Sequence, residues 1–199
     1  MTLEGKFIVF EGTDGVGKTT QVSILTEHLS KIGYSVLQVC TPSNFYREDE
    51  HVVLYNKTGS GLLTPTTLAV MSAADRLRTY DTTIKPHLDS GGTVVCDRYK
   101  FSAEAYFAMR GADIPLLREI HDKLPNPNHA ILLTIDALTR QARLRKRATT
   151  EDWEEQDMRY QDTVQNMIRD GWRKEYSIID AGQSIEDVSS KINDYLGIR

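Results

Sequence analysis

The sequence has few cysteines, no long apolar run and no excess of positive charge. Its two cysteines, Cys40 and Cys96, both stand in apolar runs, so we expect reduced core residues in a cytoplasmic protein. No apolar run approaches the roughly 18 residues that a membrane-spanning helix requires, so no membrane segment is predicted. With 28 acidic and 24 basic residues the net charge is −4, which argues against binding a nucleic-acid polymer.

What is present is an ordinary globular composition over 199 residues, with 40% apolar and 26% charged residues, which predicts one domain spanning 1–199. Short apolar runs predict five strands at Lys6–Glu11, Ser35–Cys40, Thr93–Cys96, Ala130–Ile135 and Tyr176–Ile179. Helical patterns lie between and after them, at Thr19–Ile32, Thr66–Leu88, Ser102–Arg110, Pro115–Lys123, Thr139–Arg147, Asp157–Arg169 and Ile185–Leu196.

This alternation predicts an α/β fold: a five-stranded parallel sheet flanked by helices on both faces. The segment Asn44–Gly61 shows no clear periodicity and is expected to be a mobile loop that closes on a bound ligand. Ligands of such sheets bind beyond the carboxyl ends of the strands, so the residues that follow each strand are the candidates for a site.

The first strand is followed by a string that fits the phosphate-binding pattern G-x-x-x-x-G-K-[ST] and opens a helix. Its glycines let backbone N–H groups turn toward phosphate oxygens at a helix N-terminus. Lys18 can reach the β- and γ-phosphates, and the hydroxyl of Thr19 can bind Mg²⁺. We therefore predict that ATP and Mg²⁺ bind here, through Gly12, Thr13, Asp14, Gly15, Val16, Gly17, Lys18, Thr19 and Thr20.

A phosphate-binding loop leaves the reaction open among GTPase, motor and kinase. A GTPase would carry N-K-x-D after a strand, and the nearest string, Asn56 to Gly59, lacks the aspartate. A small kinase fits the length and strand count better. A nucleotide-binding regulator without turnover would tolerate damage at Lys18, Thr19 or Asp97, and all three are intact.

Further charged residues follow later strands. Asp97 ends the third strand, where a P-loop protein keeps an acid near Mg²⁺, and Arg98 can hold a phosphate in a bidentate manner. Arg76, in the long predicted helix, is either a base or phosphate ligand or a solvated helix residue. The Asp97–Arg98 pair could also be a surface ion pair, although its place in a P-loop protein disfavours that alternative.

Five cations between Arg140 and Arg147 precede an acidic stretch, residues 151–157. We predict a mobile helical lid, about residues 143–157, that closes over the phosphates; the alternative is a solvated helix beside an acidic loop. Because the P-loop carries no Arg or Lys at positions 13 to 16, the lid is the natural source of positive charge.

These motifs together resemble the thymidylate kinase family of P-loop nucleoside monophosphate kinases, over nearly the whole chain. The resemblance rests on Phe10 to Gln21, on Pro65 to Arg76, on Asp97-Arg98-Tyr99 with Ser102, Ala105 and Tyr106, and on Asp136 with Arg143 and Arg147. It implies a homodimer that transfers phosphate from ATP to dTMP with Mg²⁺.

The resemblance also implies residue roles. Asp14 holds the 3′-hydroxyl of the acceptor deoxyribose, Arg98 binds the acceptor phosphate, and Arg76 reaches the base carbonyl. Tyr106 lies against the sugar and disfavours a 2′-hydroxyl, with Ser102 nearby. Arg143 packs near the donor adenine, and the lid charges come from Arg145, Lys146 and Arg147, of which Arg147 is the predicted catalytic one.

The departures from the family pattern cluster around the acceptor. After the second strand only Pro42 clearly matches, and the phosphate-binding arginine of that loop is either lost or displaced to Arg47. Ser72 occupies the position of the family's base-stacking Phe, leaving Phe45 or Tyr46 as candidates to replace it. Phe107 stands where Gln is usual. Two acceptors therefore stay open: dTMP, or a different or modified nucleoside monophosphate.

Overall fold

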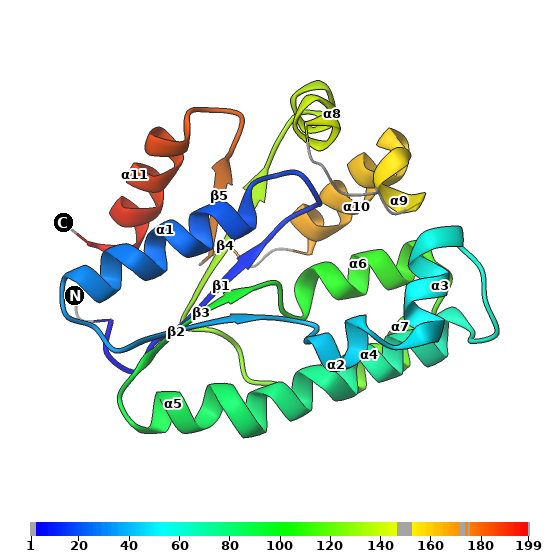
Figure 1. Cartoon of the computed structure of the whole chain (residues 1–199), viewed down its shortest axis with the longest axis horizontal. Coiled ribbons are helices and arrows are strands. Elements are labelled where there is room, and N and C mark those ends of the chain that lie inside the picture. The colour runs from blue at the N-terminus through cyan, green and yellow to red at the C-terminus, as the bar shows by residue number, and fades with distance from the viewer. Residues whose placement is uncertain (1–2, 147–152, 172–173, 175, 199) are drawn as a thin grey trace.

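Five strands form one parallel sheet in the order β2-β3-β1-β4-β5, as the computed structural model of the chain shows (Figure 1). The structure describes residues 3–146, 153–171, 174 and 176–198. The strands are β1 (Phe7–Glu11), β2 (Val36–Cys40), β3 (Thr93–Asp97), β4 (His129–Thr134) and β5 (Ser177–Asp180). Every neighbouring pair is parallel, and each strand lies within one residue of its predicted range. The predicted fold class is confirmed.

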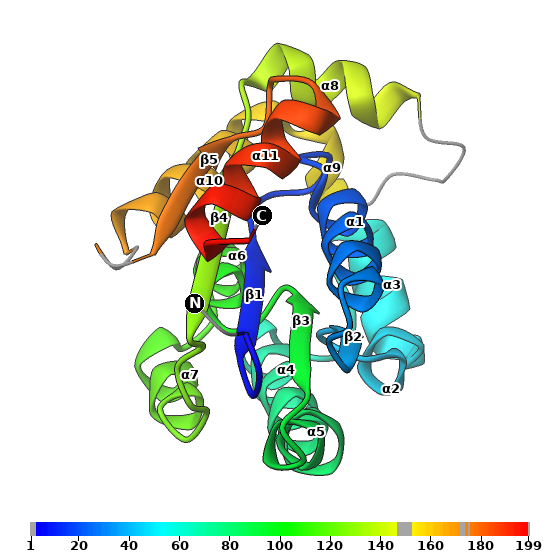
Figure 2. The ribbon, with the colours of Figure 1, turned by 90° about the vertical axis from the view of Figure 1, so that its left-hand side faces the viewer.

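Helices α1 (Lys18–Lys31) and α11 (Ile185–Leu196) cover one face of the sheet, as the second view shows (Figure 2). Side chains of β1 alternate between the faces, as the pleat of a strand requires. Ile8 and Phe10 join the core under α1 and α11, whereas Phe7 and Val9 join the core on the opposite face. Burial on both faces explains why β1 is a continuous apolar run in the sequence.

A long helical run borders the opposite face: α4 (Pro65–Thr79), the π-helical turn η1 (Tyr80–Ile84) and α5 (Lys85–Asp89). The side chain of Thr64 accepts a hydrogen bond from the Thr67 amide, and Pro65 occupies the first turn, so this run begins where the sequence predicts. Three further helices, α6 (Phe101–Met109), α7 (Ile114–His121) and α10 (Met158–Asp170), complete this side.

The expectation of a loop over 44–61 is wrong, because this segment contains α2 (Asn44–Arg47) and α3 (Glu50–Thr58). Each helix has its own cap: Ser43 accepts from the Phe45 amide, and Asp49 accepts from the amides of the first turn of α3. The buried side chains of Tyr46, Val52 and Tyr55 pack in the core that α4 and α6 share. Two short helices with a break between them give no continuous helical period in the sequence.

The described parts of the predicted lid are the end of α8 (Ala137–Arg145) and the short helix α9 (Trp153–Gln156). Residues 147–152, including Arg147, lie outside the described residues, so this part of the lid prediction stays a prediction. The single-domain assignment also stays a prediction. Within the described ranges, no helix combines the length and the apolar character needed to cross a membrane.

Candidate active site

The loop between β1 and α1 forms a phosphate cradle. Gly12 and Gly17 have φ angles of 141° and 103°, which L-residues with side chains rarely adopt. A Cβ on Gly12 would lie 2.5 Å from the carbonyl oxygen of Leu133, so a side chain does not fit there. The buried Nζ of Lys18 donates to the Thr13 carbonyl at 2.8 Å. Burial and the nearby charge of Arg98 lower the pKa of Lys18 to about 8. A polyanionic ligand would supply the counter-charge that this lysine needs.

Thr19 and Asp97 meet beside the cradle, as predicted for a Mg²⁺ site. Asp97 ends β3, and its Oδ2 accepts a hydrogen bond from Thr19 Oγ1 at 2.7 Å. The other carboxylate oxygen, Oδ1, is buried and has no hydrogen-bond partner among the described residues. A hydroxyl and a carboxylate supply the oxygen ligands that Mg²⁺ prefers. The residues present therefore fit the ion.

A second charged group links the P-loop to the end of β3. Arg98 Nη2 donates to Asp14 Oδ1 at 2.5 Å, and Arg98 Nη1 donates to Ser102 Oγ at 3.3 Å. The hydroxyl of Tyr106 donates to the other oxygen of Asp14 at 3.0 Å. Burial raises the pKa of Asp14, but the charges of Arg98 and Lys18 outweigh it and hold that pKa well below its ordinary range. Asp14 is therefore ionised at neutral pH.

Arg76 is buried beside the cavity described below, and the solvated alternative for it is wrong, since only 3% of it is exposed. Its Nε donates to the Tyr99 carbonyl at 2.6 Å, and its Nη1 donates to the carbonyl of Ser72 at 2.9 Å and also to the Ser72 hydroxyl. The preceding residue, Asp75, accepts from the amide and the hydroxyl of Ser43 at 2.6 and 2.5 Å. The segment after β2 is thereby tied to α4.

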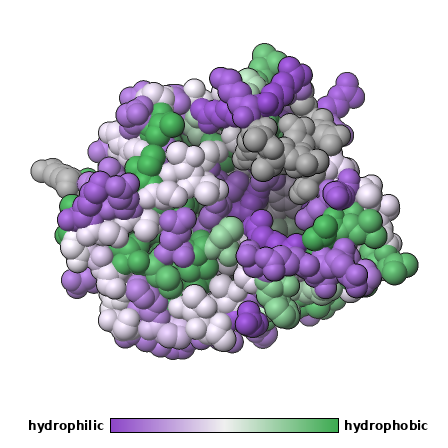
Figure 3. All heavy atoms as spheres, viewed as in Figure 1, coloured by the Kyte–Doolittle hydropathy of each residue, from purple (hydrophilic) through white to green (hydrophobic). Residues whose placement is uncertain are grey.

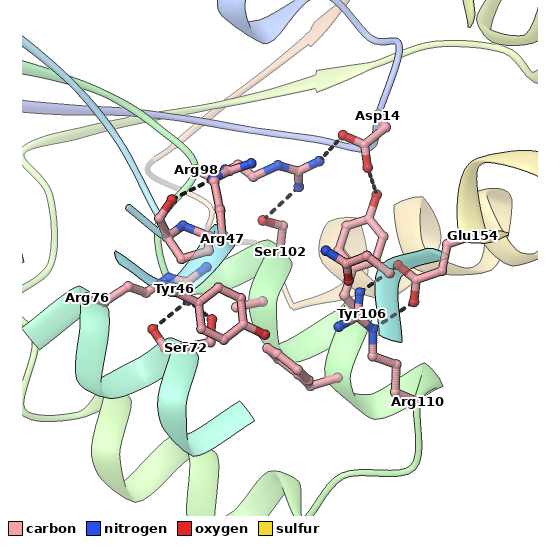
Figure 4. Close-up of a pocket in the computed structure, with 14 residues that line it drawn as sticks. Asp14, Tyr46, Arg47, Ser72, Arg76, Arg98, Ser102, Tyr106, Arg110 and Glu154 are labelled. Atoms are coloured by element: carbon pink, nitrogen blue, oxygen red, sulfur yellow. Dashed lines mark hydrogen bonds and ion pairs between the residues drawn. The ribbon is translucent and has the colours of Figure 1, made fainter. Parts of the chain in front are cut away.

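These groups surround a cavity of about 300 Å³ at the carboxyl edge of the sheet (Figure 4). All the residues predicted to bind the acceptor line this cavity, which we call the acceptor cavity: Asp14, Pro42, Arg47, Ser72, Arg76, Arg98, Ser102 and Tyr106. A second cavity, of about 210 Å³, lies over the P-loop and shares Asp14, Arg47 and Arg98 with the first. The surface is hollowed on this side, with hydrophilic side chains around the hollow (Figure 3).

A third cavity, of about 250 Å³, lies on the other side of the P-loop, between α1 and the segment that leads into α11. Val16, Gly17 and Thr20 line it together with Arg143. Arg143 donates through Nη1 to the Val16 carbonyl at 3.2 Å and through Nη2 to the Ala181 carbonyl at 2.8 Å. The predicted adenine neighbour therefore sits beside the cradle, whereas Arg145 and Lys146 are exposed at the end of α8.

Sequence reasoning missed an ion pair that also lines the acceptor cavity. Arg110 donates to both carboxylate oxygens of Glu154, at 2.7 and 2.8 Å, and both side chains are almost buried. The guanidinium lies 5.2 Å from the ring centroid of Tyr55 and 5.0 Å from that of Phe107. The two partners are 44 residues apart, Arg110 just after the end of α6 and Glu154 in α9, so no local spacing signals their contact.

Cys40 corrects the expectation of two core cysteines, because Cys40 is exposed and only Cys96 is buried. Cys40 ends the edge strand β2 and lines the cavity over the P-loop. Its sulfur accepts a hydrogen bond from Arg47 Nη2 at 3.3 Å, while Arg47 Nε donates to the Pro42 carbonyl at 2.6 Å. Arg47 is thus held where both cavities meet.

A parallel sheet with a phosphate cradle after β1 and an adjoining acceptor cavity defines a P-loop nucleoside monophosphate kinase. The family model described as thymidylate kinase matches residues 10–192. The chain belongs to the thymidylate kinase family, and the resemblance seen in the sequence is confirmed.

The sequence matches to relatives cover almost the whole length of both chains. A probable thymidylate kinase of Pyrococcus horikoshii is 33% identical, with 96% of this chain and 95% of the relative covered. A thymidylate kinase of Francisella tularensis subsp. novicida is 29% identical, with 96% and 94% covered. The solved structure of thymidylate kinase from Candida albicans superposes with a TM-score of 0.77 at 22% identity, covering 99% of this chain and 93% of that one. This last similarity supports the fold.

Proposed function

We propose that the protein transfers the γ-phosphoryl group of ATP to dTMP, giving dTDP and ADP. One observation carries this proposal: the cavity over the P-loop and the acceptor cavity adjoin and share Asp14, Arg47 and Arg98. A triphosphate on the cradle and a monophosphate at Arg98 would therefore face each other. Membership of the thymidylate kinase family makes dTMP the first acceptor to test.

The chemistry needs no general base, because an acceptor phosphate oxygen is already anionic. That oxygen attacks the γ-phosphorus in line, and the bond to the bridging oxygen breaks, so that ADP leaves. The protein's task is positioning and charge neutralisation. Lys18 would neutralise the donor phosphates, and the fork of Arg98, anchored by Asp14, would hold the acceptor phosphate.

The nucleoside part of the acceptor would lie along the remaining wall. We assign the 3′-hydroxyl to Asp14 and the sugar face to Tyr106, whose ring also borders the Arg98 guanidinium at 5.2 Å. The guanidinium of Arg76 only donates hydrogen bonds, so it suits a carbonyl at the base edge and disfavours an amino group. This chemistry favours thymine or uracil over cytosine.

Thr19 and Asp97 would hold Mg²⁺ next to the cradle. The ion, when bound, neutralises charge that develops on the transferred group. The cations that follow, Arg143, Arg145, Lys146 and Arg147, would supply further positive charge from the lid. Exclusion of water by such a lid favours transfer to dTMP over hydrolysis of ATP.

We also infer that the protein acts as a cytoplasmic homodimer of single-domain chains, as the resemblance to its family implies. Sedimentation equilibrium measures the oligomeric state directly, and a monomeric mass at the concentrations used in activity assays would contradict the dimer.

A second acceptor is supported by a specific feature, the combination of Ser72 and Phe107 in the acceptor cavity. These side chains make a different or modified nucleoside monophosphate the alternative substrate. The test is ADP release with ATP, Mg²⁺ and a panel of dTMP, dUMP, UMP, CMP, dCMP, AMP and GMP. A clear preference for dTMP supports the proposal, and faster turnover of another acceptor supports the alternative. Retained transfer in Lys18→Ala would contradict the assignment of the phosphate site.

A further inference from the structure

The acceptor cavity has one end that adjoins the P-loop cavity, and its remaining wall combines aromatic side chains with Arg76 and the Arg110–Glu154 ion pair. Arg47 and Arg98 lie at the end that adjoins the P-loop cavity, where a phosphate belongs. Away from that end the wall contains Tyr46 of α2, with Ser72 of α4 beside it (Figure 4). We propose that the ring of Tyr46 is the surface on which the acceptor base stacks. This inference rests on the proposed function and names a specificity-determining residue for it.

Tyr46 is held rigidly although its helix has only four residues. It is 6% exposed and packs in the core that contains Val52, Ala73 and Ala103. The Ser43–Asp75 hydrogen bonds anchor the start of α2 to α4, three residues before the ring. A fixed ring is an effective stacking surface, because little side-chain entropy is lost when a base binds.

The orientation of Tyr46 keeps its polar atom away from the phosphate end. Its hydroxyl is buried and is directed toward Arg110 (Figure 4). Burial raises the pKa of this hydroxyl, and the charge of Arg110 only partly opposes that rise. The hydroxyl is therefore protonated at neutral pH, and the cavity faces a neutral aromatic ring, which suits a neutral base.

The other aromatic residue of α2 does not serve this role. Phe45 is 72% exposed, and its ring centroid lies 5.1 Å from the guanidinium carbon of Arg78, outside the residues that line the cavity. Of the two candidates that the sequence offered, only Tyr46 is among the residues that line the acceptor cavity. Its neighbour Arg47 lines both cavities, so adjacent residues of one short helix would contact the base and the phosphate.

The small side chain of Ser72 is a condition for this arrangement. Ser72 is 1% exposed, and its hydroxyl accepts a hydrogen bond from Arg76 on the next turn of α4. A phenylalanine at position 72 would compete with the Tyr46 ring for the same part of the wall. The two positions should therefore be interchangeable as sources of the aromatic surface, but not compatible when both are large.

The test measures dTMP binding by calorimetry without ATP, so that affinity is separated from turnover. Tyr46→Ala should weaken dTMP binding by about 5- to 150-fold, the range expected for loss of one stacked base. Tyr46→Leu, which keeps apolar bulk, should fall between Tyr46→Ala and Tyr46→Phe, and Tyr46→Phe should retain most of the affinity. Phe45→Ala is the matched control on the same helix and should leave dTMP binding unchanged, as should every variant for ATP binding.

The reciprocal exchange makes the test sharper. Ser72→Phe alone should weaken dTMP binding, and Tyr46→Ala combined with Ser72→Phe should bind more tightly than Tyr46→Ala. Affinity within twofold of wild type in Tyr46→Ala overturns the inference, as does an equal loss in Tyr46→Phe and Tyr46→Ala. A double variant as weak as Tyr46→Ala also counts against it. Wild-type protein that binds dTMP without transferring phosphate refutes only the proposed function, whereas wild-type protein that does not bind dTMP refutes both.

Discussion

Replacing Lys18 should raise the stability of the protein while abolishing its activity. Its ammonium group is buried in the P-loop, where the pKa falls from 10.5 to about 8. At pH 7 a fall of that size corresponds to about 3 kcal/mol of free energy that opposes folding, because 1.4 kcal/mol equals one pKa unit. Replacing Lys18 by Met removes this penalty and also removes the charge that binds phosphates. Lys18→Met should therefore lose phosphoryl transfer and gain thermal stability.

The net gain is smaller than the electrostatic penalty. Lys18→Met leaves the buried Thr13 carbonyl without its 2.8 Å hydrogen bond, at a cost of about 1 kcal/mol. The remainder, about 2 kcal/mol, should raise the melting temperature by about 4–8 °C for a chain of this size. The difference should also depend on pH. Between pH 8 and 10.5 the unfolded chain holds a proton on Lys18 that the folded chain has lost, so wild-type stability rises with pH and the difference shrinks.

Thermal and urea unfolding at pH 7 and pH 10, followed by circular dichroism, measure this difference. Lys57→Met is the matched control, since Lys57 is exposed on α3 and the chemical change is the same. Added ATP should stabilise the wild type and not Lys18→Met. A variant less stable than wild type at pH 7, or a gain that does not shrink as pH rises, would refute the reasoning.

Three further predictions concern the remaining parts of the site. Arg110→Met should destabilise the fold by about 3–5 kcal/mol in urea unfolding, because it leaves the buried carboxylate of Glu154 without its cationic partner. Replacing both partners by Met should lower the free energy of unfolding clearly less. Asp97→Asn should lower transfer by about 10- to 100-fold and raise the Mg²⁺ concentration needed for half-maximal rate. Arg143→Ala should raise the KM for ATP by about 3- to 30-fold and leave the KM for dTMP unchanged; equal changes in both would contradict its donor-side assignment.

The parts of the site that the sequence predicted lie directly after strands or within one motif. The cradle from Gly12 to Thr19 follows β1, and Asp97 and Arg98 come at the end of β3. Parallel strands bring their carboxyl ends to one edge, so a residue's place relative to a strand determines where it lies in the fold. This explains why Asp14, Pro42 and Arg98 share a single cavity, whereas Ser72 and Arg76 of α4 and Ser102 and Tyr106 of α6 were predicted only through the family resemblance.

The parts that the sequence did not reveal depend on contacts between distant segments. Whether Phe45 or Tyr46 points inward depends on how α2 docks on α4 through Ser43 and Asp75. Arg110 meets Glu154 only because α9 lies next to α3 and α10 packs on α6. No single periodic pattern contains both members of such a pair, because the two members lie in segments that are far apart in the sequence.

The network around Asp14 explains how donor and acceptor sites can act as one. Asp14 belongs to the P-loop, yet its two oxygens bind Arg98 and Tyr106, which line the acceptor cavity. Arg98 also has a φ of 65°, a conformation that costs a non-glycine residue on the order of 1–3 kcal/mol and persists only when neighbours enforce it. The ion pair with Asp14 is such an enforcement. Movement of the P-loop by a donor would therefore move the anchor of Arg98, the proposed ligand of the acceptor phosphate, so that the two binding events would share one charge network.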